Sequence, residues 1–121
     1  MIDHVSIPVR DLAAAAAFYE RVLEPLGYKR LAQRPTAVGF GKKYPELWLN
    51  LRADMPADAN PGTHVALRAA SQDAVRAFHA AALEGGATDD GAPGPRQAAV
   101  TGYYGAFIRD PDGNRIEAVT F

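Results

Sequence analysis

Two histidines and one glutamate are the residues of this chain whose types and spacing best suit metal chemistry. His4 lies in Asp3-His-Val-Ser-Ile7 and His64 lies in Thr63-His-Val-Ala-Leu67, so one short pattern occurs twice. Imidazole nitrogens are common protein ligands of zinc, nickel, cobalt and iron, and a carboxylate often completes such sites. Glu117 supplies a carboxylate, and we expect the fold to bring it to both histidines.

The segments around the two histidines predict half-buried strands. Val5, Ile7 and Val9 share one face of the first strand, and His4 points to the other. A pseudo-twofold axis between duplicated units would aim His4 and His64 at one point. A lone strand histidine is usually structural or exposed, but two at matching positions favour metal ligation over an empty polar cavity.

The C-terminal residues 107–121 predict a β-hairpin that presents Glu117. Two apolar runs flank Asp110-Pro-Asp-Gly-Asn114, in which the proline fixes φ and the glycine accepts a positive φ. In the returning strand, Ile116 and Ala118 share the face that would pack on a helix. Glu117 therefore points to the opposite, less apolar face.

The whole sequence predicts a tandem duplication within a single domain, residues 1–121. A linker at 54–62, rich in Pro, Asp, Asn and Ala, separates module one, 1–53, from module two, 63–121. Each module is expected to have the order β-α-β-β-β. The expected strands cover residues 2–9, 28–32, 37–40, 46–51, 63–67 and 103–109 and the returning limb of the hairpin.

One amphipathic helix is predicted in each module. Asp11 is a good N-cap for a helix over residues 12–23, and Ser71 caps a second helix that runs to about Glu84. His79 on this second helix is expected at the surface. A Gly/Pro-rich stretch, Gly91 to Gly102, is expected to be a long loop of the kind that often covers binding sites.

Composition limits the classes of function. With 121 residues, 48% hydrophobic and 22% charged, the chain can bury a core without disulfides, and it has no cysteine. A formal net charge of −1 gives no reason to expect nucleic acid or an anionic membrane as partner. No apolar run approaches the roughly 20 residues that span a bilayer. We therefore expect a soluble, cytoplasmic protein.

These motifs resemble the vicinal oxygen chelate superfamily, which includes glyoxalase I, extradiol dioxygenases, fosfomycin-resistance enzymes and bleomycin-resistance proteins. The resemblance implies an α+β fold in which two tandem βαβββ modules form a U-shaped, mixed and antiparallel sheet around a central cavity. It also implies a divalent metal (Zn, Ni, Co, Mn or Fe), whose coordination substrate oxygens complete, and a homodimer. The matching stretches are Asp3 to Val9, Asp11-Leu12, Phe18-Tyr19, Val22-Leu23, Gly27, Thr63 to Leu67 and Asp110 to Glu117.

The resemblance assigns metal ligands to particular positions of this chain. His4, His64 and Glu117 match three of them. For a fourth, Glu46 fits one alignment of the last strand of module one, and a slip of two residues places Trp48 there instead. Both residues lie on the same face, so alternation leaves the choice open. In the first case Glu46 is a ligand, and in the second Trp48 is a wall of the pocket.

Several further residues are candidates for binding substrate. Trp48, Tyr103 and Tyr104 could line a pocket or pack in the sheet, and alternation allows only one of the two tyrosines to face the cavity. Arg68, on the same strand face as His64, and Arg96 could each hold a carboxylate or phosphate, although such arginines are often simply solvated.

A narrower group of small single-domain members shares three stretches with this chain, Pro45 to Leu49, Ala92 to Arg96 and Gly102 to Phe107. Members of that group often carry histidines where this chain has Gln97-Ala98-Ala99-Val100-Thr101. An activated water or a metal-bound carboxylate, Glu117 or Glu46, is therefore the expected base.

Two main functions remain open. One is a metal-dependent enzyme of the lyase or isomerase type, acting on a substrate that chelates the metal through adjacent oxygens. The other is a metal-free protein of the bleomycin-resistance type that sequesters a small molecule. The presence of His4, His64 and Glu117 argues for the enzyme, and a degenerate relative with only an assembly role is a third possibility.

Overall fold

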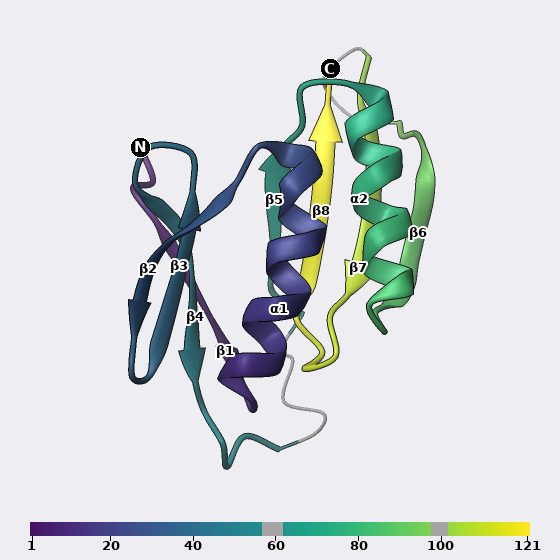
Figure 1. The fold of residues 1–121 in the computed structure, drawn as a ribbon. Helices are drawn as coiled ribbons and strands as arrows, with labels where there is room; N and C mark the ends of the chain where they lie inside the picture. Colours follow the sequence, from purple (N-terminus) through teal and green to yellow (C-terminus); the bar gives the residue numbers. More distant parts are fainter. Residues whose placement is uncertain (57–61, 98–101) are drawn as a thin grey trace.

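Two modules of the same design make up the protein (Figure 1). The structure, a computed structural model, describes residues 1–56, 62–97 and 102–121. Module one contains β1 (Val5–Val9), α1 (Leu12–Leu23), η1 (Glu24–Leu26), β2 (Lys29–Arg34), β3 (Ala37–Gly41) and β4 (Pro45–Leu51). Module two contains β5 (His64–Arg68), α2 (Gln72–Glu84), β6 (Thr88–Pro95), β7 (Tyr104–Arg109) and β8 (Arg115–Thr120). The predicted α+β class with tandem modules is confirmed.

Each module forms one four-stranded sheet, and the two sheets have the same strand order. The orders are β1-β4-β3-β2 and β5-β8-β7-β6. The first strand pairs parallel to the last, while the other neighbours are antiparallel. The predicted sheet around a central cavity therefore consists of two halves, and β1 and β5, which carry the histidine motifs, lie at their edges.

The helices determine which face of each sheet is apolar. On β8, Ile116 and Ala118 belong to the buried core with residues of α2, such as Phe78. On β1, Ile7 and Val9 are buried in the same core. Since successive strand residues point to opposite faces, Ser6 of β1, His64 and Arg68 of β5, and Glu117 of β8 are directed away from the helices. None of the helices in the described ranges is long and apolar enough to cross a membrane.

Both helices begin and end where the sequence predicts. The Asp11 side chain accepts a hydrogen bond from the backbone N–H of Ala14 at 3.0 Å, and the Ser71 hydroxyl accepts one from Ala74 at 3.1 Å. These bonds satisfy N–H groups that a helix leaves unpaired in its first turn. Gly27, with φ of 81°, follows the short η1 and turns the chain into β2.

Two sequence expectations are wrong. The first part of the expected loop, from Gly91 to Pro95, belongs to strand β6, which begins at Thr88. The prolines of β6 are tolerated because it is an edge strand. His79 is buried rather than exposed, because it lies on the face of α2 that packs against β6, where its Nε2 is 2.8 Å from Asp89 Oδ1. The segment from Gln97 to Thr101 lies outside the described residues except for Gln97.

The turn of the C-terminal hairpin joins the two modules. Asp110, which is buried, accepts a hydrogen bond from the Tyr19 hydroxyl of α1 at 2.6 Å. Arg10 pairs with Asp112 at 3.0 Å. The Asn114 side-chain amide donates to the backbone carbonyl of residue 8 at 2.8 Å. Residues 110, 112 and 114 therefore connect module two to module one within one chain.

Candidate functional site

His64 and Glu117 form the centre of the candidate site. Strand register places Glu117 opposite Ala66, so His64 is its diagonal neighbour on the same face. His64 Nε2 lies 3.3 Å from Glu117 Oε2. Glu117 is only 2% exposed, whereas half of the His64 side chain is accessible. A buried carboxylate thus fixes an imidazole that solvent or a ligand can reach.

Tyr103 holds the other oxygen of the same carboxylate. Its hydroxyl donates a hydrogen bond to Glu117 Oε1. Gly105 makes this contact possible, because a Cβ at that position would lie 3.1 Å from both Glu117 Oε1 and the Tyr103 ring. Tyr103 also packs edge-on against Phe121, with ring centroids 5.4 Å apart. Both oxygens of Glu117 are therefore oriented by neighbouring side chains.

The environment of Glu117 acts on its charge in two directions. Burial raises the pKa of the Glu117 carboxyl, because desolvation disfavours the charged form. The His64 charge and hydrogen bond and, more weakly, the charge of Arg96 act to lower the same pKa, and the net direction is upward. A cation placed beside this carboxylate would favour the ionised form.

The spacing of His64 and Glu117 suits a metal ion. Two ligands bound at about 2.0–2.1 Å to one tetrahedral ion stand about 3.3 Å apart, the separation of His64 Nε2 and Glu117 Oε2. His4 has matching chemistry, since its Nδ1 is 2.7 Å from Asp3 Oδ1. That arrangement, with a carboxylate at one ring nitrogen, leaves Nε2 for a metal.

His4 is nevertheless separate from the central pair. Within residues 1–56, 62–97 and 102–121, no group of three or more His, Cys, Asp or Glu side chains is close enough to hold a metal ion. His4, Glu46 and His64 do line a common open hollow, here called the N-terminal hollow, between the starts of β1 and β5. The structure thus brings together two of the predicted ligands, His64 and Glu117. It places His4 and Glu46 around the N-terminal hollow, which His64 also lines.

The register of the sheets identifies the counterpart of Glu117 in module one. Trp48 pairs with Ser6, as Glu117 pairs with Ala66, and these partners occupy equivalent places in the two modules. Trp48, and not Glu46, is therefore the equivalent residue. The Trp48 ring lies close over Gly39, and the guanidinium of Arg34 is 4.8 Å from its centroid.

Glu46 and the remaining candidates have distinct surroundings. The Glu46 carboxylate accepts a hydrogen bond from the backbone N–H of Lys42 at 3.3 Å. Tyr104 points away from Tyr103, toward α2, where its hydroxyl accepts a hydrogen bond from Arg76 at 2.9 Å. Of the two candidate tyrosines, Tyr103 is therefore the one that lies beside the central pair.

The two candidate arginines each stack on an aromatic ring. The Arg68 guanidinium is 4.4 Å from the Phe121 centroid, and that of Arg96 is 5.6 Å from the Phe107 centroid. Arg96 also donates to the backbone carbonyls of Pro95 and Ala92, which folds it back over β6. Arg68 and Arg96 therefore lie around the central pair without bonding it directly.

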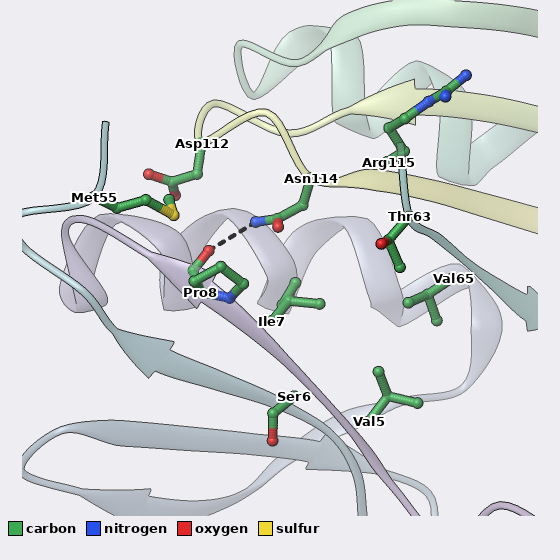
Figure 2. A pocket seen from close by; sticks show the side chains of 10 residues that line it. All are labelled: Val5, Ser6, Ile7, Pro8, Met55, Thr63, Val65, Asp112, Asn114 and Arg115. Carbon is green, nitrogen blue, oxygen red and sulfur yellow. Dashed lines mark hydrogen bonds between the residues drawn. The ribbon is translucent and has the colours of Figure 1, made fainter. Parts of the chain in front are cut away.

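A second cavity, the inter-module cavity, lies between the edges of β1 and β5 and has a volume of about 270 Å³ (Figure 2). The turn between β7 and β8 and the segment after β4 line one end of it (Figure 2). Sequence reasoning missed this cavity and the roles of Asp3 and Phe107. Asp3 stands in the repeated histidine motif, which was an available signal, but the approach of β1 to β5 leaves no mark in the sequence.

Known proteins share both the sequence pattern and the fold. A family model described as Glyoxalase/Bleomycin resistance protein/Dioxygenase superfamily matches residues 1–118. A glyoxalase/bleomycin resistance protein from Albidiferax ferrireducens T118 has 31% identity and a TM-score of 0.87, over 97% of this chain and 96% of that one. A family enzyme from Burkholderia phytofirmans PsJN, with 20% identity and a TM-score of 0.74 over 98% and 96%, shares the fold.

A larger protein contains the same fold within a longer chain. Glyoxalase I from Zea mays has 26% identity and a TM-score of 0.71, over 97% of this chain but 44% of its own length. Among curated proteins, no sequence matches this chain. The family match over nearly the whole length, together with the relative at 31% identity, determines the classification. The chain belongs to the glyoxalase/bleomycin resistance protein/dioxygenase superfamily.

Proposed function

We propose that the protein is a metal-dependent enzyme of the lyase or isomerase type, acting on a small molecule with two adjacent oxygens. The observation that supports it best is the pair His64 and Glu117, whose donor atoms are 3.3 Å apart. We propose His4, His64 and Glu117 as the ligands of a divalent ion, Zn, Ni, Co, Mn or Fe. When bound, such an ion polarises substrate oxygens and stabilises developing negative charge.

The chain's own residues have separate tasks in this proposal. Tyr103 and His64 orient the two oxygens of Glu117, which keeps the carboxylate in one rotamer although it is buried. Asp3 holds His4 through Nδ1. Trp48 forms an aromatic wall in module one, while Arg68 and Arg96 supply positive charge for an acidic group of the substrate. Glu117 or Glu46 then serves as the base that moves the substrate proton.

Loss of metal in defined variants tests the proposal. Gently purified protein should contain close to one equivalent of a divalent metal per chain, measured by elemental analysis. The double variant His4→Ala, His64→Ala should contain none, and Glu46→Gln tests the fourth ligand in the same assay. A wild-type protein that stays metal-free after reconstitution with each candidate ion would refute the enzyme.

A homodimer is part of the proposal. In such a dimer, the His4 that joins His64 and Glu117 belongs either to the same chain or to the second copy. Mixing the single variants His4→Ala and His64→Ala separates these cases. If the ligands come from two chains, mixed dimers contain one intact site and regain metal. If one chain supplies all of them, the mixture stays as empty as either variant. We propose the cytoplasm as the compartment of this assembly, in keeping with a chain that has no cysteine.

A metal-free binding protein is the second candidate. Two observations favour it, the lack of a three-donor cluster within the described parts of one chain and the cavity between β1 and β5. Ligand affinity that survives both the removal of metal and the His4→Ala, His64→Ala changes would support this function over the enzyme.

A further inference from the structure

We propose that the inter-module cavity takes up the apolar part of the ligand. The protein would then act on an amphipathic small molecule, with two adjacent oxygens at one end and an apolar ring or short chain at the other. This inference rests on the proposed function, because the oxygens are taken to lie at His64 and Glu117.

The walls of the cavity are mainly apolar. Val5 and Ile7 of β1 and Val65 of β5 point toward the space between the strands, and Met55 approaches from the segment after β4 (Figure 2). Apolar cavities bind hydrocarbons rather than ordered water. The apolar walls of this cavity therefore favour an apolar occupant.

The three charged or amide side chains at the rim, Asp112, Asn114 and Arg115, already have partners. Asp112 Oδ1 accepts from the backbone N–H and the guanidinium of Arg10, each at 3.0 Å. The Asn114 amide donates to Asp110 and to the backbone carbonyl of Pro8. The Arg115 side chain points away from the cavity (Figure 2). It pairs with Asp90 at 3.0 Å. These groups therefore do not require a charged ligand inside.

The cavity is next to the candidate metal ligands. It shares Val5, Thr63 and Val65 with the N-terminal hollow, which His4 and His64 line. Val65 and His64 are successive strand residues and point to opposite faces, so a ligand whose oxygens lie near His64 reaches the apolar space by passing through the gap between β1 and β5. The volume of about 270 Å³ exceeds the roughly 150 Å³ in which a dry cavity binds benzene, so one ring with a short substituent fits.

A series of hydroxamic acids tests the inference, because each carries two adjacent oxygens and the apolar chain can be lengthened one methylene at a time. Acetohydroxamic to octanohydroxamic acid would be titrated calorimetrically into the zinc-loaded protein. We expect Kd to fall about fourfold per added methylene until the chain fills the cavity, and then to level off. A Kd that does not change with chain length would overturn the proposal.

Two variants that fill the cavity locate the effect. Thr63→Leu and Val65→Met each add apolar volume at its wall, and either suffices if the other fails to fold. In both variants, Kd should change less with the chain length of the hydroxamic acid than in the wild type. Thr36→Leu makes the same change in the exposed turn between β2 and β3 and should keep the wild-type dependence. Because the slope compares ligands within one variant, any effect of Thr63→Leu on the neighbouring His64 cancels.

The proposed function and this inference fail in different ways. Binding of acetohydroxamic acid that persists in EDTA-treated protein contradicts the metal site. In that case, a dependence of Kd on chain length that Thr63→Leu abolishes still supports the cavity. Conversely, metal-dependent binding of the shortest acid, with equal slopes in wild type and both filling variants, contradicts the cavity alone. If no hydroxamic acid of any length binds, the inference is refuted.

Discussion

Replacing Tyr103 by phenylalanine tests whether its hydroxyl holds the Glu117 carboxylate. Glu117 is 2% exposed, so water cannot take the place of the lost donor at Oε1. A hydrogen bond to a charged group contributes about 1.5–3 kcal/mol, and burial favours the upper part of that range. We expect Tyr103→Phe to lower the free energy of unfolding of the metal-free protein by this amount at pH 8.

Urea unfolding in the presence of EDTA, followed by the fluorescence of the single tryptophan, Trp48, measures the change. Burial raises the pKa of Glu117, so lowering the pH protonates this carboxyl in the folded state and weakens its demand for a donor. The difference between wild type and Tyr103→Phe should therefore be largest at pH 8 and decrease at pH 5. In the metal-loaded protein the same change should weaken metal binding about 10- to 100-fold.

Tyr104→Phe is the matched control, because Tyr104 is the next residue and points to the opposite side. Its hydroxyl accepts from Arg76, whose side chain is half exposed, so the loss should stay below about 0.5 kcal/mol. Equal destabilisation by the two substitutions, or a Tyr103→Phe effect that does not depend on pH, would refute the reasoning.

Three further predictions concern other parts of the fold. Gly105→Ala should cost about 1–3 kcal/mol in urea unfolding, because its Cβ would press on Glu117 and on the Tyr103 ring. Burial and Asp110 raise the pKa of Tyr19, so the tyrosine of the unfolded chain ionises first as pH rises above about 10. The stability of the fold should therefore decline above that pH, and Tyr19→Phe should reduce the decline in a pH series of melting temperatures. His79 lowers the pKa of Asp89, so the ionised Asp89 carboxylate stabilises the fold at neutral pH, and this stabilisation is lost as pH falls through the lowered pKa. Asp89→Asn should remove this part of the fall in melting temperature at acid pH in the same series.

Local patterns in the sequence predicted much of the fold. The caps at Asp11 and Ser71 and the apolar periodicity gave the limits of both helices, and the alternation around Glu117 gave its face. The strand β6 was missed because Gly91 and Gly94 usually signal loops, whereas an edge strand tolerates them. His79 was misjudged because burial depends on how α2 sits against β6.

The candidate site was predictable in its residue types but not in its assembly. Matching motifs identified His4 and His64, and alternation identified Glu117. Periodicity could not separate Glu46 from Trp48, since residues two apart share a face, and only the pairing of Trp48 with Ser6 makes it the counterpart of Glu117. Contacts such as Tyr103 with Glu117 depend on the space at Gly105, which sequence patterns do not reveal.

Equivalent positions of the two modules carry a carboxylate, Glu117, and an indole, Trp48. The two sides of the duplicated framework therefore differ in their chemistry. A flat molecule between the modules would face an ionisable oxygen on the side of Glu117 and a broad aromatic surface on the side of Trp48. With Glu117 as the proposed base, proton transfer would reach only one face of such a molecule. A product with a new stereocentre would then form as a single enantiomer, although the backbone around it is nearly symmetric.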